Sequence, residues 1–101
     1  MSCSLSTHVL DTAAGRPAEG VTVELFVSGD GFQRCLASGV TDGDGRIGAL
    51  AQDLAGGTYQ LVFHPPSPFF TRVELQLELT EGHYHVPLLV SPYGCATYRG
   101  S

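Results

Sequence analysis

Alternation of apolar and polar residues is the main pattern along this chain. From residue 72 to 79 it is unbroken, with charged or amide side chains at even positions and apolar ones at odd positions: Val73, Leu75, Leu77 and Leu79. A strand places these four side chains on one face, whereas a helix would spread them around its circumference. The same period of two recurs in residues 21–27, where Phe26 interrupts it, and in residues 59–63. The pattern predicts strands rather than helices.

Turn-forming residues separate these segments at intervals of about ten residues. The turns are Gly29-Asp30-Gly31, Asp42-Gly43-Asp44-Gly45, Gly56-Gly57, Glu81-Gly82 and Pro92-Tyr93-Gly94. We expect about seven or eight strands, near residues 5–11, 20–28, 33–41, 58–64, 71–80, 83–91 and 95–99, the eighth being a piece near 48–54. Strands without helices in one domain predict an all-β sandwich or barrel.

Two segments depart from the simple strand pattern. Pro87 lies within the strand expected at 83–91, and because proline has no N–H to donate, we expect an edge strand or a bulge there. Residues 49–55 are the one place where a helical turn fits the sequence, and Gly56-Gly57 would end it.

The chain has 101 residues, which is enough for one hydrophobic core, so we expect a single domain over residues 1–101. Ten acidic residues outnumber five basic ones, for a formal net charge of −5. Nucleic acids and anionic membranes attract basic surfaces, so we expect neither as a partner. No apolar run reaches the roughly 18–20 residues that span a bilayer.

The expected cellular compartment follows from the first residues and from the cysteines. Residues 1–8 have neither the basic nor the apolar region of a secretory signal. Cys3, Cys35 and Cys95 are far apart, odd in number and without a Cys-x-x-Cys motif. We therefore expect a cytoplasmic protein with free thiols.

The histidines and one acidic turn raise the question of a metal site. His83 and His85 are two residues apart on one expected strand, so both point to the same face, and His8 or His64 could complete a three-histidine zinc site. Without a second ligand motif, we expect polar-face histidines and no metal. The turn that begins at Asp42 has the wrong residues for a calcium loop, so we interpret it as a hairpin turn that projects Arg46.

The C-terminal residues carry further candidate chemistry. The turn at 91–94 would fold the following residues back beside strand 83–91 and bring Tyr98 and Arg99 toward the sheet that carries His85. The alternative is a frayed terminal segment. Two histidines, two arginines and a tyrosine indicate acid–base work on a small anionic or amide-containing molecule.

Several motifs together carry a family resemblance. They are Leu5-Ser6-Thr7-His8-Val9-Leu10-Asp11, Thr41-Asp42-Gly43-Asp44-Gly45-Arg46, residues 57–63, the run from His83 to Gly94, and Tyr98-Arg99-Gly100-Ser101. On these motifs, which span nearly the whole chain, the protein resembles the transthyretin-related family, and within it the 5-hydroxyisourate hydrolases of urate breakdown. The last tetrapeptide is the most specific, because it is similar to the feature that separates these hydrolases from the hormone-carrying transthyretins.

The resemblance implies a two-sheet sandwich of the transthyretin (prealbumin) type, assembled into a homotetramer with sites at a subunit interface and no cofactor. It implies hydrolysis of 5-hydroxyisourate to 2-oxo-4-hydroxy-4-carboxy-5-ureidoimidazoline by acid–base ring opening with water. The residues that match the family's catalytic set are His8, Arg46 and His85, and those that match its substrate-binding set are Tyr98, Arg99, Gly100 and Ser101.

The chain departs from its relatives in one connection. Relatives usually carry a short helix after the strand that ends at Phe63, but residues 64–70 contain three prolines, so we expect a bare loop. Two other functions remain open. One is a transthyretin-like module that binds a small ligand without catalysis, and the other is a structural prealbumin-like domain of a larger assembly. The histidines, Arg46 and the tail favour the hydrolase over both.

Overall fold

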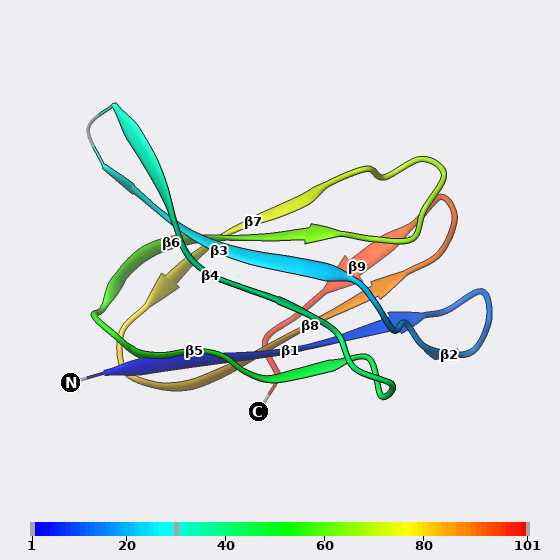
Figure 1. The fold of residues 1–101 in the computed structure, drawn as a ribbon, viewed down its shortest axis with the longest axis horizontal. Helices are drawn as coiled ribbons and strands as arrows, with labels where there is room; N and C mark the ends of the chain where they lie inside the picture. Colours follow the sequence, from blue (N-terminus) through cyan, green and yellow to red (C-terminus); the bar gives the residue numbers. More distant parts are fainter. Residues whose placement is uncertain (1, 30, 101) are drawn as a thin grey trace.

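The computed structural model describes residues 2–29 and 31–100, which form nine strands in two sheets (Figure 1). Within this part of the chain no helix has the length and apolar character needed to cross a membrane. The strands are β1 (Cys3–Asp11), β2 (Arg16–Pro17), β3 (Thr22–Gly29), β4 (Phe32–Val40), β5 (Arg46–Leu54), β6 (Gly57–His64), β7 (Val73–Leu79), β8 (Gly82–Val90) and β9 (Cys95–Thr97).

The two sheets pack face to face around one core, which confirms the expected all-β sandwich of two sheets. One sheet has the order β2-β1-β8-β9, with β5 also paired to β1, and the other has the order β4-β3-β6-β7. The alternating residues of β6 and β7 are paired as the sequence pattern requires, with Leu61 opposite Leu75 and Phe63 opposite Val73. The apolar side chains of β6 and β7 pack in the core against residues of the other sheet such as Leu5 and Leu88, which are fully buried.

The pairing that positions the site joins β1 to β8 in parallel. Every residue of β1 has a partner in β8, so that Ser4 lies opposite His83 and Ser6 opposite His85. In Figure 1 these two strands, dark blue and orange, run side by side through the same sheet. Because successive side chains of a strand alternate between its faces, the odd residues of β1 enter the core and the even ones face outward.

Strand β5 is longer than the expected piece at 48–54. The prediction of a possible helical turn in residues 49–55 is wrong, because most of this segment is strand. Strand β5 pairs with β1 through two register shifts, one on each side of the Leu5–Ala51 pair. Extra residues in β5 at these bulges break the period of two, so its inward-facing residues occur at uneven spacing: Ile47, Leu50, Ala51 and Leu54. That spacing is why the segment has a helix-like pattern. The sequence also missed β2, whose two residues are too few for a pattern.

Pro87 lies in an interior strand, so the expectation of an edge position is wrong. Strand β8 has β1 on one side and β9 on the other. On the β9 side the pairing ends at Leu88–Thr97 and resumes only at the His85–Gly100 bridge. In the unpaired stretch between these two points, Tyr98 lies opposite Pro87, which has no N–H to donate. The proline is tolerated because β9 is short.

The connection between β6 and β7 is a bare loop, as the prolines predict. Ser67 organises it, because its hydroxyl accepts the backbone N–H groups of Phe69 and Phe70 and donates to the carbonyl of Pro92. The loop is thereby attached to the turn that precedes β9.

Candidate active site

The outer face of the β1–β8 sheet brings together the three candidate catalytic residues. His8 of β1 is the direct partner of Arg46 at the start of β5, and Ser6 of β1 is the direct partner of His85 in β8. Direct partners on adjacent strands project to the same face, and so do residues two apart on one strand. His8, Arg46 and His85 therefore share one surface, at positions far apart in the sequence.

The turn before β5 determines where Arg46 projects. The Asp42 carboxylate accepts the backbone N–H of Asp44 at 2.9 Å and that of Arg46 at 3.0 Å. Gly45 has φ of 73°, and a Cβ there would lie 2.5 Å from the carbonyl oxygen of Val9, so only glycine fits. The bonds from Arg46 and then Asp44 hold the pKa of Asp42 below its usual range. The turn is tight, but the expected hairpin is wrong, because β4 before it and β5 after it lie in different sheets and do not pair. It places Arg46 at the start of β5.

His85 is half-buried and is held from one side by Ser6, whose Oγ lies 2.8 Å from its Nδ1. Burial lowers the pKa of His85, and electrostatic repulsion from His8, Arg46 and His83 lowers it further. The imidazole is therefore neutral at neutral pH and has a lone pair available to accept a proton.

His8 presents an unsatisfied polar atom at the same surface. Its Nε2 is buried and has no hydrogen-bond partner among the residues that the structure describes. Buried polar atoms are paired in the large majority of cases. An orphan nitrogen beside Arg46 therefore marks a position where a ligand, a water or another chain can bind.

The C-terminal segment folds back beside β8 and reaches His85. Gly100 donates its backbone N–H to the carbonyl of His85 at 2.6 Å. A Cβ on Gly100 would lie 2.7 Å from Cδ2 of the imidazole, so any larger residue here would displace the ring or the tail. Tyr98 is exposed and, in the register of β9 with β8, lies on the same side as His85. Ser101 lies outside the described residues.

Arg99 is not brought to the histidines. Its guanidinium carbon lies 4.2 Å from the centre of the Tyr84 ring, and Tyr84 projects to the face of β8 opposite to that of His85. A cavity of about 510 Å³ opens here between β7 and the tail, lined by Tyr98 and Arg99 but by none of the three candidate catalytic residues.

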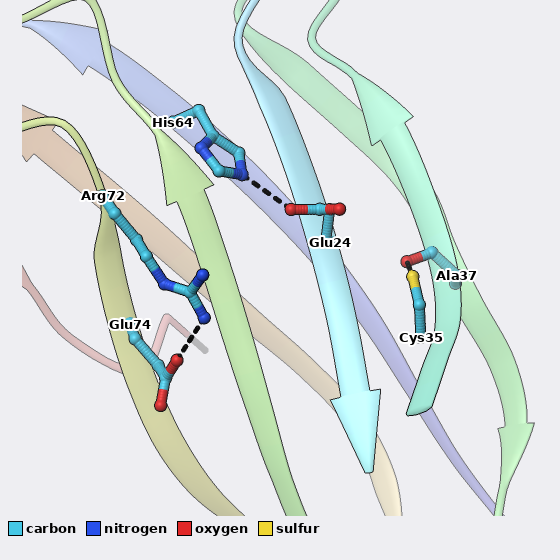
Figure 2. A network of polar contacts seen from close by, with 6 residues as sticks. All are labelled: Glu24, Cys35, Ala37, His64, Arg72 and Glu74. Carbon is cyan, nitrogen blue, oxygen red and sulfur yellow. Dashed lines mark hydrogen bonds and ion pairs between the residues drawn. The ribbon is translucent and has the colours of Figure 1, made fainter. Parts of the chain in front are cut away.

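The structure also shows how the histidines considered for a zinc site are arranged. Figure 2 shows the His64 imidazole of β6 pointing to Glu24 of the neighbouring strand β3. The two are joined by a hydrogen bond of 2.6 Å between Nε2 and Oε1, in the sheet that does not carry His83 and His85. Within residues 2–29 and 31–100 no group of three or more His, Cys, Asp or Glu side chains is arranged to hold a metal ion. His83 and His85 are instead bridged by the hydroxyl of Ser6. Sequence reasoning missed Ser4 and Ser6, because their role depends on the parallel register.

Comparison with known proteins places a sandwich of this topology and histidine–arginine surface in one family. The model of the HIUase/Transthyretin family matches residues 5–100, and the chain belongs to that family. Among curated relatives, 5-hydroxyisourate hydrolase 2 of Rhizobium meliloti (strain 1021) is 43% identical, with 96% of this chain and 95% of the relative covered. The 5-hydroxyisourate hydrolase of Deinococcus radiodurans is also 43% identical, with the same coverage.

Solved structures in both branches of the family have the same backbone. The structure of Klebsiella pneumoniae 5-hydroxyisourate hydrolase superposes with a TM-score of 0.84 at 40% identity, over 98% of this chain and 99% of that one. Sea bream transthyretin in complex with thyroxine superposes with a TM-score of 0.86 at 29% identity, over 97% and 95%. The backbone alone therefore does not separate the two branches, and the side chains must.

Proposed function

We propose that this protein hydrolyses 5-hydroxyisourate in urate degradation, opening the ring with water. The observation that carries the proposal is the meeting of His8, Arg46 and His85 on one outer sheet surface. Relatives at about 40% identity over nearly their full length bear the name of this hydrolase, which supports the activity. The reaction belongs to the class in which water attacks an amide-like carbon and a ring nitrogen departs.

Each residue type suits one part of this reaction. Water needs a base, the leaving nitrogen needs a proton, and the oxyanion that develops needs a positive group. We assign the base to His85, because burial and nearby positive charge keep it neutral. Arg46 stabilises the oxyanion and orients the ring, and His8 donates the proton to the nitrogen. Each acid or base contributes roughly 10²–10⁴-fold.

The tail forms one wall of the proposed pocket. Gly100 lies against His85 and Tyr98 lies on the same side, which supports contact of both with substrate. Ser101 stays a predicted substrate-binding residue. Arg99 keeps the tail in place through its stacking on Tyr84, so its contribution to substrate binding is indirect within one chain.

We further propose that the protein is a homotetramer in the cytoplasm, with each site completed at a subunit interface. Strand β7 is one edge of its sheet, β9 is one edge of the other, and both line the same cavity, so they offer unpaired backbone groups on one side of the molecule. The orphan Nε2 of His8 supports completion by another chain. All three cysteines are free, which is typical of a reducing compartment. Sedimentation equilibrium tests the assembly.

The decisive experiment is the ultraviolet decay of freshly generated 5-hydroxyisourate with and without the protein. The substrate opens spontaneously, so the rate without protein is the baseline. Acceleration in proportion to protein, lost in His8→Ala and Arg46→Ala, is the expected result. Arg72→Ala is the matched control, because Arg72 pairs with Glu74 on the other sheet (Figure 2). A folded protein with only the baseline rate would favour a ligand-binding module, as in the transthyretin branch.

A further inference from the structure

Four side chains form a hydrogen-bonded chain that leads away from His85 along the outer sheet surface. Ser4 Oγ lies 2.7 Å from Nδ1 of His83, Nε2 of His83 lies 2.8 Å from Ser6 Oγ, and Ser6 Oγ lies 2.8 Å from Nδ1 of His85. The parallel register creates this arrangement, because it sets each serine opposite one histidine. We call these four residues the Ser–His chain. The proposed acid–base assignments use only its last residue.

The direction of the hydrogen bonds in the Ser–His chain determines which nitrogen of His85 carries the proton. A serine hydroxyl has one proton, and a neutral imidazole has one N–H. Ser6 lies between two ring nitrogens, so it donates to one and accepts from the other. When Ser6 accepts from Nδ1 of His85, the Nε2 of His85 has a free lone pair and is a base. When Ser6 donates to that Nδ1, the Nε2 of His85 carries the proton and is an acid.

We propose that Ser6 and His83 are positioning residues for His85, and that the Ser–His chain transfers positive charge from His85 to His83 during hydrolysis. This inference rests on the proposed function and deepens it. His85 then needs no stable imidazolium form while water is being activated.

The proton transfer balances as follows. Nε2 of His85 takes a proton from water, and the hydroxide oxygen forms a bond to the substrate carbon. The Nδ1 proton of His85 passes to Ser6 Oγ while the hydroxyl proton of Ser6 passes to Nε2 of His83. His85 and Ser6 end neutral, and His83 ends as the imidazolium. In the reverse transfer, Nε2 of His83 returns its proton to Ser6 while Ser6 returns one to Nδ1 of His85, and the His85 imidazolium then releases its Nε2 proton to the leaving nitrogen or to solvent.

The surroundings of the two histidines favour this direction of charge transfer. His85 is half-buried and faces His8 from β1 and Arg46 from β5, which repel a positive charge. His83 is exposed and shares a surface groove with Asp53 of β5, whose carboxylate attracts a positive charge. Water and Asp53 therefore stabilise the imidazolium at His83 better than the site stabilises it at His85.

The first test is direct and needs no substrate. Nitrogen-15 NMR of histidine-labelled protein reports the protonation of each ring nitrogen. In Ser6→Ala we expect the Nδ1 and Nε2 signals of His85 to shift to a different tautomer balance, whereas Ser6→Thr, which keeps a hydroxyl, recovers the wild-type signals. His64 is the internal reference, because it and its partner Glu24 both lie in the sheet that does not contain Ser6. Unchanged His85 signals in Ser6→Ala would overturn the inference.

The second test uses hydrolysis. Ser6→Ala and His83→Gln should each lower kcat about 10-fold to 100-fold with little change in KM, within the range of acid–base contributions. In His83→Gln the acidic limb of the kcat/KM profile should also move to higher pH, because electrostatic repulsion from His83 no longer lowers the pKa of His85. A general structural defect would lower the rate equally at every pH. Ser38→Ala, an exposed serine on β4, is the control.

The outcomes separate the inference from the proposed function. A hydrolase whose kcat and pH profile are unchanged by both substitutions would keep its function and lose the role of the Ser–His chain. A wild-type protein without hydrolysis would overturn the proposed function and the charge transfer together. The NMR result then decides whether Ser6 still controls the tautomer of His85.

Discussion

His8 and Arg46 are direct partners across the antiparallel pair of β1 and β5. The partner of His8 in β8 is Pro87, and His85 lies two residues before that proline. The guanidinium and both imidazoles thus project from three strands of one sheet. A sheet surface of this kind holds its side chains on paired backbone, which keeps them in a fixed mutual orientation.

Gly100→Ala tests the contact between the tail and His85. The added methyl group would lie 2.7 Å from the imidazole and 3.2 Å from the His85 carbonyl, so either the ring or the tail must move. We expect kcat/KM for 5-hydroxyisourate to fall at least about ten-fold with an unchanged Tm. Gly43→Ala is the control, since a Cβ at Gly43 has no atom within 4 Å. Equal activity in both variants would contradict the contact.

Asp42→Ala tests the turn that projects Arg46. Loss of the carboxylate removes the acceptor of the Arg46 and Asp44 N–H groups, so we expect Arg46 to become mobile and kcat to fall about ten-fold. Asp42→Asn keeps an oxygen at this position and should lose less. Asp44→Asn, in the same turn, is the control. Hydrogen exchange should show the structural change as weaker protection of the backbone amides in the turn.

The same carboxylate gives a pH dependence of stability. The bonds from Arg46 and then Asp44 lower the pKa of Asp42 in the folded state. The unfolded state therefore binds more protons, and the contribution of Asp42 is present above the usual carboxyl pKa of about 3.9 and is lost as pH falls through the lowered value. Urea unfolding at a series of pH values should show a smaller acid loss of stability in Asp42→Asn. An identical loss in both proteins would count against the assignment.

His85 should govern the acidic limb of the pH–rate profile. Its pKa is lowered first by burial and then by His8, Arg46 and His83, so the wild-type protein should keep activity below the usual histidine pKa of about 6.5. In Arg46→Gln one positive neighbour is gone, and the limb should move to higher pH alongside a fall in kcat of about 100-fold. Titration of His85 by NMR checks the same shift without turnover. A limb that stays in place would assign it to another group.

Arg99 and Tyr84 should act as one unit. Stacking of an exposed guanidinium on an aromatic ring contributes about 0.5–1 kcal/mol, so Arg99→Gln should lower kcat/KM about three-fold by loosening the tail. A double-mutant cycle with Tyr84→Leu should show that the second substitution adds little to the first. Independent effects, with a large increase of KM in Arg99→Gln, would instead mean that Arg99 contacts the substrate.

The strands with unbroken alternation were predictable from the sequence, and those with bulges were not. Val73–Leu79 falls inside the expected 71–80, because each side chain follows the pleat. Strand β5 was only partly foreseen, since register shifts opposite Leu5 hide its period. The site residues His8, Arg46 and His85 followed from motifs, and the tail's return to His85 followed from its turn. The Ser–His chain and the side taken by Arg99 depend on pairing between distant strands, which no local pattern contains.

Parallel pairing of β1 with β8 also has a consequence for how the molecule folds. Ser6 and His85 are 79 positions apart, so their strands meet only after nearly the whole chain has been made. Closing so long a loop costs entropy before any contact repays it, which slows folding. A nascent chain that ends before β8 would carry His8 and Arg46 without His85. Recovery of activity during refolding would therefore report the completion of the sandwich.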